Sequence, residues 1–276
     1  MSIPLQYPTT VMSPFEAIAG VYDDMFSNTA IGRSQRRSIW CEMDRAFHSG
    51  DSVLELNCGT GVDALHMAQR GIRVDACDSS PGMIAHAAQR AASGTNRAAI
   101  RCRCLAIESL DLLTPEKPYD GVLSNFSGLN CVEDLQHVVR SLSRLVRPGG
   151  RAVVCLFGTR CLWEMLWYLR TGNVHKAFRR FRRRAVKATI GKDATVMVHY
   201  RTVSSVNRTF APYFQLKRSR GVGVTLPPSY AGVIPEKFPR LFRVAIALDP
   251  VLGRCPMVWS LADHVILTFE RLEAAP

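Results

Sequence analysis

The sequence predicts an α/β fold with a doubly wound, mostly parallel sheet. From residue 50 to residue 157, short apolar runs of strand length alternate with helical segments. The spacing between successive runs suits right-handed crossovers, which parallel strands require. The length of 276 residues suits one such core with an added lobe. Hydrophobic residues make up 47% of the chain and charged residues 21%, so a packed core is expected and global disorder is not.

Two helical segments are expected before this alternation. The first, over residues 14–26, begins at Ser13-Pro14, which supplies a cap and a first-turn proline. The second runs from about residue 33 to residue 48. The alternating elements that follow are strands at 52–56, 72–77, 100–107, 119–125 and 151–157, and helices at 63–70, 81–92 and 132–146.

The alternation ends after Phe157, and residues 161–188 have helical spacing. The elements expected beyond them are strands at 195–200, 214–217, 242–248 and 264–269, with a turn at Pro227-Pro228. We therefore expect an N-terminal helical lid, a core in two pieces and an inserted lobe between the pieces. Their ranges are 1–49 for the lid, 50–157 and 233–276 for the core, and 158–232 for the lobe.

Several features constrain the compartment. The apolar run at 161–169 contains Glu164 and is too short to span a bilayer. The first ten residues show no basic region followed by an apolar run, so no secretory signal is expected. Nine cysteines without a C-x-x-C pair or a His/Cys cluster at zinc spacing predict a reduced, cytoplasmic protein without a metal site.

One strand-to-helix junction carries a ligand-binding pattern. Leu54-Glu-Leu-Asn-Cys-Gly-Thr-Gly61 contains two glycines, which allow a tight turn and a close approach of a ligand to the backbone. Asp78 ends the next strand, where a carboxylate can accept both hydroxyls of a ribose. The spacing Gly59-x-Gly61-x-x-Ala64 also fits the loose dinucleotide fingerprint, so an NAD(P) oxidoreductase is an alternative.

Charge separates these two alternatives. In a dinucleotide site the pyrophosphate lies at the N-terminus of the first helix, where a carboxylate would repel it. Asp63 stands in that first turn, and Glu55 stands in the preceding strand. Two carboxylates favour a ligand that carries a sulfonium and an ammonium group. S-adenosylmethionine has both, and it has a ribose for Asp78.

Four segments within residues 50–157 carry a family pattern. They are Val53-Leu-Glu-Leu-Asn-Cys-Gly-Thr-Gly61, Asp78-Ser-Ser-Pro-Gly-Met83, Tyr119-Asp-Gly-Val-Leu-Ser-Asn-Phe126 and Leu145-Val-Arg-Pro-Gly-Gly-Arg-Ala-Val-Val154. Their order and spacing resemble the class I, Rossmann-like S-adenosylmethionine-dependent methyltransferases, in the branch that modifies quinones, lipids, sugars and other small metabolites. The resemblance implies a seven-stranded sheet with an antiparallel last strand. It also implies S-adenosylmethionine as the cofactor and S-adenosylhomocysteine as its product.

The same resemblance implies which residues bind the cofactor. They are Glu55, Asn57, Gly59 and Gly61 for the methionine part, Asp78 for the ribose, Ser79 and Met83 for the adenine, and Asn125 and Phe126 beside the methyl group. Asn57 stands where glycine is common, but asparagine tolerates unusual backbone angles, so the loop is expected to be intact. Ala106 stands where many relatives have an acid for the adenine amino group. The backbone of Ile107 and the carboxylate of Glu108 are the candidates to replace that acid.

The predicted lid contains a further resemblance. Tyr22 and Asp23 are similar to a Tyr-Asp pair of the family, whose tyrosine closes over the donor. Arg33 or Arg36 could bind the donor carboxylate through a charge-assisted bond. The alternatives are that Tyr22 packs in the core and that both arginines are solvated. We favour the functional interpretation for Tyr22 and the solvated one for the arginines.

Methyl transfer depends mainly on the alignment of the donor with the acceptor. Methyl transfer from a sulfonium is an in-line displacement, so most of the catalytic work is positioning of the acceptor. A base is needed only when the acceptor carries a proton. The candidates are His199 and Tyr200 in a predicted strand and His175, although a lone histidine in a strand is more often structural. Cys131 has no partner close in sequence and is expected to be inert.

The formal charge of +12 is concentrated in one region. Residues 165–192 hold nine Lys or Arg and no acid, and in 176–187 Phe178, Phe181 and Ala185 share one helical face. A solvated basic face whose apolar stripe covers the cleft is the favoured interpretation. An anionic substrate, a carrier protein or a lipid surface is the second, and nucleic acid is the third. The upstream aromatics are expected to line an acceptor pocket or the core: Trp163, Trp167 and Tyr168.

Three functions therefore compete. The favoured one is a methyltransferase acting on an O, N or C atom of a small or lipid-like molecule. A nucleic-acid- or anionic-surface-binding protein is the second, and no recognisable nucleic-acid-binding module supports the nucleic-acid form. An NAD(P) oxidoreductase is the third.

Overall fold

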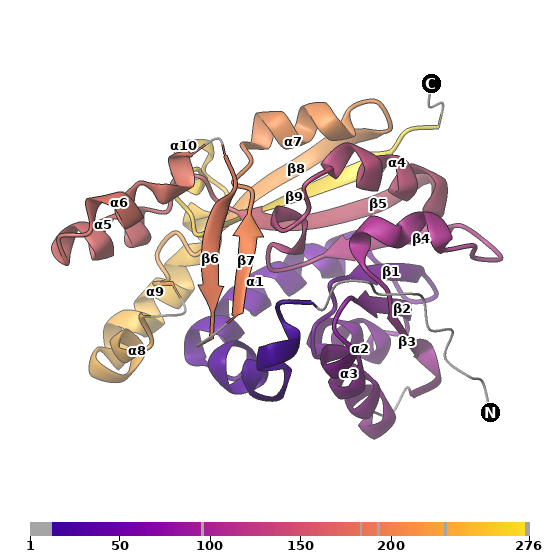
Figure 1. Ribbon diagram of the computed structural model, residues 1–276, viewed down its shortest axis with the longest axis horizontal. Coiled ribbons are helices and arrows are strands. Elements are labelled where there is room, and N and C mark those ends of the chain that lie inside the picture. Colours follow the sequence, from indigo (N-terminus) through magenta and orange to yellow (C-terminus); the bar gives the residue numbers. More distant parts are fainter. Residues whose placement is uncertain (1–12, 95–96, 183, 192–193, 229–230, 274–276) are drawn as a thin grey trace.

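The computed structural model describes residues 13–94, 97–182, 184–191, 194–228 and 231–273 (Figure 1). Residues 1–10 and Arg183 of the basic run lie outside the described residues. The centre is a seven-stranded sheet of order β3-β2-β1-β4-β5-β9-β8. Strands β1 to β5 pair in parallel, and β9 is antiparallel to both β5 and β8. The predicted fold class, with an antiparallel last strand, is confirmed.

The bounds of the elements follow the sequence closely in the first half of the chain. The strands are β1 Ser52–Leu56, β2 Arg73–Asp78, β3 Ile100–Cys104, β4 Tyr119–Ser124, β5 Val146–Phe157, β6 Val186–Ile190, β7 Ala194–Val198, β8 Phe214–Val222 and β9 His264–Arg271. The α-helices are α1 Ala30–Ala46, α2 Val62–Gln69, α3 Pro81–Ser93, α4 Leu135–Leu145, α5 Leu162–Arg170, α6 Val174–Ala177, α7 Val203–Phe210, α8 Val233–Lys237, α9 Pro239–Leu252 and α10 Pro256–Trp259. The short irregular helices are η1 Glu16–Val21, η2 Asp23–Ser27, η3 Arg97–Ala99, η4 Ile107–Leu112, η5 Gly128–Asn130 and η6 Arg179–Phe181.

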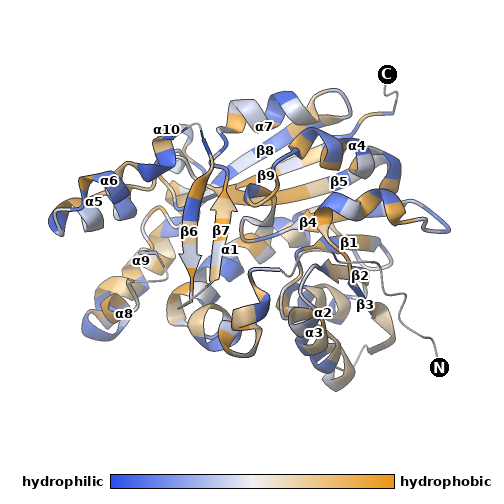
Figure 2. Ribbon diagram, viewed as in Figure 1, coloured by the Kyte–Doolittle hydropathy of each residue, from blue (hydrophilic) through white to orange (hydrophobic). Residues whose placement is uncertain are grey.

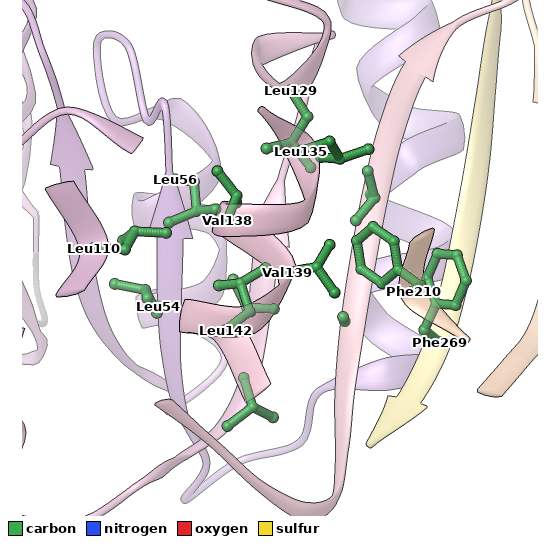
Figure 3. Close-up of a cluster of buried hydrophobic side chains, with 14 of the residues drawn as sticks. Leu54, Leu56, Leu110, Leu129, Leu135, Val138, Val139, Leu142, Phe210 and Phe269 are labelled. Atoms are coloured by element: carbon green, nitrogen blue, oxygen red, sulfur yellow. The ribbon is translucent and has the colours of Figure 1, made fainter. Parts of the chain in front are cut away.

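Helices cover both faces of the sheet, so its strands bury side chains on both sides. In β1, Leu54 and Leu56 pack with α4, α7 and η4 on one face (Figure 3). Val53 packs with α1, α2 and α3 on the other face. This alternation follows from the two-residue period of a strand. It explains why the strands appear as nearly continuous apolar runs in the sequence.

The opening segment differs from its prediction. Residues 14–26 were expected to form one helix, but they form the 3₁₀ helix η1 and the π-helix η2. Side-chain contacts hold the chain in place here, instead of the regular backbone hydrogen bonds of an α-helix. Thr29 then caps α1, and its hydroxyl accepts the backbone N–H of Gly32 at 3.0 Å.

The prediction of a strand at 242–248 is wrong, because these residues belong to helix α9. A short apolar run has the same composition in a buried strand and in a helix, and here Pro239 begins the helix at its first turn. The sheet is completed instead by β8, which was expected to be a shorter strand inside the lobe. The proposed lobe of 158–232 therefore contains one strand of the main sheet.

The prediction of helix over residues 161–188 is only partly correct. Gly172, at φ +72°, follows α5, and the segment continues through α6 and η6 into β6. β6 pairs antiparallel with β7 in a separate hairpin. At the hairpin turn, a Cβ on Gly191 would lie 2.7 Å from Cγ2 of Ile18 in η1. The hairpin therefore closes against the opening segment. No helix in the described part of the chain is long and apolar enough to cross a membrane.

Candidate functional site

The loop after β1 has the backbone that its sequence predicts. Asn57, Gly59 and Gly61 all have positive φ, at +47°, +54° and +76°. The Asn57 amide donates to the carbonyl of Asn125 at 2.6 Å, and its oxygen accepts the hydroxyl of Ser124 at 2.7 Å. Asparagine in place of glycine therefore joins the ends of β1 and β4 without loss of the turn.

The two glycines of this loop serve different purposes. A Cβ at Gly61 would lie 2.9 Å from the Ala87 Cβ, so Gly61 is required for close packing of α3. A Cβ at Gly59 would meet only Cε1 of Tyr22, at 3.9 Å. The space over Gly59 is therefore the part of the loop that is open to a ligand.

Asp78 lies at the end of β2 beside this loop. Its carboxylate accepts the backbone N–H of Gly59 and that of Ser80, both at 2.9 Å. Burial raises the pKa of Asp78, and these backbone hydrogen bonds oppose that shift. The side chain is thus held in one orientation at the edge where a ribose would lie.

A cavity lies over the loop, and its lining residues come from five separate segments of the chain. Of the residues expected to bind the cofactor, it is lined by Tyr22, Asn57, Gly59, Asp78, Met83, Asn125 and Phe126. The expected residues outside its lining are Glu55, Gly61, Ser79, Ala106, Ile107 and Glu108. The structure thus brings together residues that were predicted for the methionine part, the ribose and the methyl group. The adenine-side contacts of Ser79, Ala106, Ile107 and Glu108 stay predictions.

The two carboxyl groups near the loop, those of Glu55 and Asp63, differ in their hydrogen-bond partners and in the direction of their pKa shifts. Glu55 is buried, its Oε2 lacks a hydrogen-bond partner among the described residues, and burial raises its pKa well above the usual range. Asp63 accepts hydrogen bonds from Arg36 at 2.6 Å and from Trp40 and Asn125 at 2.7 Å. Burial alone would raise the pKa of Asp63, but Arg36 and these hydrogen bonds lower it.

This pairing corrects two expectations. Arg36 was expected to be solvated, yet it is 6% exposed, lines the cavity and lies 4.6 Å from the ring centre of Phe126. Its charge compensates Asp63, so the simple picture of two free carboxylates is wrong. Arg33 is exposed, as expected, and it donates to the carbonyl of Asn28.

Two acids hold the opening segment over the cavity: Glu16, which the sequence analysis did not single out, and Asp23 of the Tyr-Asp pair. Glu16 accepts the hydroxyl of Ser80 and the backbone N–H of Gly82. Asp23 accepts the hydroxyl of Thr60 at 2.7 Å and pairs with Arg90. These contacts place Tyr22 above Gly59, and burial raises the pKa of Tyr22 to about 12.

A second, larger cavity of about 360 Å³ adjoins the first. The two share Phe15, Tyr22, Phe126 and Gly128 in their linings. Its apolar wall comes from η1, η2 and the β6–β7 hairpin: Ile18, Met25, Phe26, Val196 and Val198. Its polar wall consists of Glu164, Arg179, Arg180, Tyr200, Asp263 and His264.

The polar wall contains two arginines of the basic run. Arg180 is buried and donates to Glu164 and Asp263, both at 2.7 Å. Arg179 donates to both oxygens of Glu164, at 2.7 and 2.9 Å. The expectation of a solvated basic face is therefore wrong for these two residues. Phe178 and Phe181, expected to cover the cleft, are instead 42% and 50% exposed.

The candidate bases lie in different places. Tyr200 lines the second cavity, and burial raises its pKa. His199 is outside the cavity lining, and burial and Arg201 lower its pKa. His175 is exposed and contacts Arg182. Burial raises the pKa of Cys131 to about 11, as expected of an inert thiol.

Sequence reasoning missed His264. It is buried at the start of β9, and its Nδ1 lies 3.3 Å from Oδ2 of Asp263. Its ring stacks on Phe157 at 5.0 Å and meets Phe126 edge-on at 5.8 Å between ring centres. The sequence placed it in a core strand, and only the adjacent pair Asp263-His264 hinted at another role. Among the described residues, no group of His, Cys, Asp and Glu could hold a metal ion.

Comparison with known proteins agrees with this geometry. Residues 53–150 match the model of a family described as a methyltransferase domain. The chain is 34% identical over 152 residues to a demethylmenaquinone methyltransferase of Thermobifida fusca (strain YX), which covers 54% of this chain and 62% of the relative. A protein of the same description from Mycobacterium marinum is 34% identical over 155 residues, 55% of this chain and 61% of the relative. The matched region thus spans about three fifths of the length of these relatives.

Solved structures share the fold at low identity. The CcbJ methyltransferase from Streptomyces caelestis superimposes with a TM-score of 0.63 at 14% identity, over 95% of this chain and 98% of that one. An S-adenosylmethionine-dependent methyltransferase from Mesorhizobium loti gives a TM-score of 0.55 at 17% identity, over 86% and 98% of the two chains. Residues 53–150 thus match a methyltransferase domain, and the chain as a whole has the fold of S-adenosylmethionine-dependent methyltransferases.

Proposed function

We propose that this protein transfers a methyl group from S-adenosylmethionine to a small or lipid-like acceptor held in the second cavity. The observation that carries this proposal is the contact between the two cavities at Tyr22, Phe126 and Gly128. One cavity has the loop and carboxylate for an adenosyl ligand, and the other has room for a separate molecule. In-line transfer requires two such sites that meet at one point.

The residues of the first cavity fit the donor. Asp78 is held for the ribose, and the open space over Gly59 allows the backbone to approach the ligand. Arg36 lines the cavity, and its Nε has no partner among the described residues, so it is the candidate for the donor carboxylate. When bound, the donor supplies a methyl group on a positively charged sulfur, next to Phe126. S-adenosylhomocysteine is then the product.

The second cavity suits a partly apolar acceptor with one polar end. Its apolar wall would hold a ring or an aliphatic chain, and its polar wall would hold a hydroxyl or carbonyl group. The relatives are named for demethylmenaquinone, so quinone-type molecules are the first acceptors to examine. Carrier-bound and anionic acceptors belong to the same proposal, since Arg179 lines this cavity.

For an acceptor that carries a proton, His264 is the base that we propose. Asp263 lies beside Nδ1 and accepts from Arg180 and, at 3.2 Å, from Gln35, so it is fixed as a charged neighbour. A carboxylate at Nδ1 favours the tautomer with its proton there, which leaves the Nε2 lone pair for the acceptor hydroxyl. As the bond between the donor sulfur and the methyl carbon breaks, the carbon would bond to the acceptor oxygen, and the hydroxyl proton would move to Nε2. Tyr200 would donate a hydrogen bond, and His199 stays a weaker candidate.

Nucleic-acid binding loses support from the same contacts. Arg179 and Arg180 face inward, so they are not available to phosphates of a nucleic acid. A cytoplasmic location remains part of the proposal, supported by nine free cysteines.

Titration calorimetry of the purified protein tests the proposal. We expect S-adenosylhomocysteine to bind and NAD⁺ and NADP⁺ to give no heat of binding. Incubation with a radiolabelled methyl donor and a panel of hydroquinones and naphthols should then label at least one acceptor. Tight binding of a nicotinamide dinucleotide, with no binding of the adenosyl compound, would contradict the proposal.

A further inference from the structure

Two helices, α5 and α9, carry apolar side chains on their exposed faces. Most of the exposed large hydrophobic side chains in the described residues lie in 162–181 and 233–251. They form one stripe on α5, made of Leu162, Leu166 and Leu169, and another on α9, made of Leu241, Val244 and Leu248. We call these two stripes, with the cations around them, the apolar-basic surface.

The stripe on α9 faces outward from a helix whose other side is firmly packed. Leu241, Val244 and Leu248 are 64%, 53% and 46% exposed, at the three- and four-residue spacing of one helix face. The opposite face is anchored by Phe242 and by Asp249, both buried. Asp249 accepts the backbone N–H groups of Gly223 and Thr225, at 3.1 and 2.9 Å. The helix is therefore fixed, and it has apolar side chains on both sides, whereas the outer face of a surface helix is ordinarily polar.

The stripe on α5 has the same organisation. Leu162, Leu166 and Leu169 are 40%, 56% and 44% exposed. On the inner face, Glu164 is buried in its ion pairs with Arg179 and Arg180. These pairs hold α5 in place, so the leucines are presented outward. Both helices lie at the end of the molecule opposite β2 and β3 (Figure 1), and apolar positions recur along both (Figure 2).

The charges around the stripes are almost all positive. Residues 159–187 contain nine Lys or Arg and one acid, and without the ion pairs of Glu164 with Arg179 and Arg180 they contain seven cations and no acid. Residues 233–254 contain four Lys or Arg and two acids, of which Asp249 is buried. Arg240 and Arg243 stand exposed beside the α9 stripe. A second copy of the chain would bring like charges together, whereas an anionic bilayer would accept both the apolar and the basic side chains.

We infer that the apolar-basic surface docks on a membrane that contains anionic phospholipid. The leucines and Val244 enter the boundary between headgroups and acyl chains, and the cations lie at the headgroup phosphates. α5 and η6 also supply Glu164, Arg179 and Arg180 to the second cavity, so docking brings the acceptor site next to the lipid. This inference concerns binding alone and does not depend on the proposed methyl transfer.

Co-sedimentation with large unilamellar vesicles tests it. The wild-type protein is expected to bind vesicles of phosphatidylcholine and phosphatidylglycerol at 3:1, and to bind pure phosphatidylcholine at least about tenfold more weakly. Raising the salt from 0.05 M to 0.5 M should weaken the binding, because the interaction of exposed cations is screened. Equal binding to both kinds of vesicle, or none to either, would overturn the inference.

Substitutions test whether the apolar-basic surface is the part of the protein that binds the membrane. Leu241→Glu with Leu248→Glu should abolish binding, and Arg240→Gln with Arg243→Gln should weaken it about tenfold to thirtyfold at low salt. Leu112→Glu is the matched control, because Leu112 is 45% exposed on η4, which is elsewhere in the fold. It should bind like the wild type. Thermal melting and S-adenosylhomocysteine titration check that each variant is folded.

A second copy as the occupant would give a different pattern. Sedimentation velocity without lipid would then show a dimer that the Leu241→Glu, Leu248→Glu variant dissociates, and vesicles would not compete with it. That outcome, or vesicle binding that the four substitutions leave unchanged, refutes membrane docking.

Discussion

The first cavity, which we propose holds the donor, and the second cavity, which we propose holds the acceptor, are built in different ways. The donor side rests on contacts between residues close to the strand ends of one sheet, such as Asp78 with Gly59 and Asn57 with Asn125. The acceptor side joins elements far apart in the chain, because Arg180 of the basic run meets Asp263 before β9. One is a backbone turn fixed by hydrogen bonds, and the other is a set of buried charges that balance each other.

This difference indicates how substitutions in each cavity affect binding and stability. A change in the loop after β1 removes hydrogen bonds between neutral groups, each of which contributes only about 0.5–1.5 kcal/mol to stability. A change among the buried charges leaves a partner without compensation in a low-dielectric interior, so it affects folding as well as function. The variants below separate these two consequences.

The largest effect is expected for Arg180→Met. It leaves Glu164 and Asp263 buried with less compensation, which should lower the free energy of unfolding by about 3–5 kcal/mol. The control is Arg179→Met, whose side chain is 24% exposed and whose loss should cost clearly less. Urea denaturation measures both, and equal losses in the two variants would count against the comparison.

The same variant has a pH dependence of known sign. In the wild type, burial opposes ionisation, but His264 and Arg180 lower the pKa of Asp263, and Arg179 and Arg180 lower that of Glu164. Their contribution to stability is therefore complete above the unfolded-state pKa values, which are about 4, and is lost as the pH falls below them. Without Arg180 these carboxyls take up protons more readily, so the deficit of Arg180→Met should be larger at pH 8 than at pH 5.

Asp78→Ala should weaken S-adenosylhomocysteine binding about 100-fold. It removes a charged acceptor for two ribose hydroxyls, each such bond contributing about 1.5–3 kcal/mol. Calorimetry measures the change, with the exposed Asp111→Ala as the control. Affinity within threefold of the wild type would show that the ribose lies elsewhere.

His264→Gln should lower kcat about 100-fold for an acceptor that carries a proton, and leave S-adenosylhomocysteine affinity unchanged. His199→Gln is the control, since His199 lies outside the cavity lining. A kcat of the His264→Gln variant within threefold of the wild type would remove His264 from the mechanism.

The smallest effect is expected for Asn57→Gly. It loses the two hydrogen bonds to β4 but keeps a residue that tolerates positive φ, so stability should fall by about 1–2 kcal/mol. Donor affinity should stay within about threefold in the same calorimetric assay. A large loss of affinity would mean that the Asn57 side chain itself binds the donor.

The sequence was informative where a few neighbouring residues decide the structure. The positive φ angles at Asn57, Gly59 and Gly61 and the strand end at Asp78 follow from local steric rules, and the structure has them. Helix α9 was mistaken for a strand, because an apolar run gives no period by which to separate the two.

The acceptor side could not be obtained in this way. Charge counting indicated that Arg180 is solvated, but its partners Glu164 and Asp263 are 16 and 83 residues away in the chain. His264 became a candidate only when β9 placed it against Phe126 and Phe157. Such contacts depend on tertiary pairing that a single sequence does not display.

A crystal structure with S-adenosylhomocysteine bound tests the central claim most directly. The account predicts that the ribose hydroxyls contact Asp78 and that the sulfur lies beside Phe126, facing the second cavity and His264. A ligand sulfur directed away from that cavity, or a ligand lodged outside the loop of Asn57, Gly59 and Gly61, would contradict it.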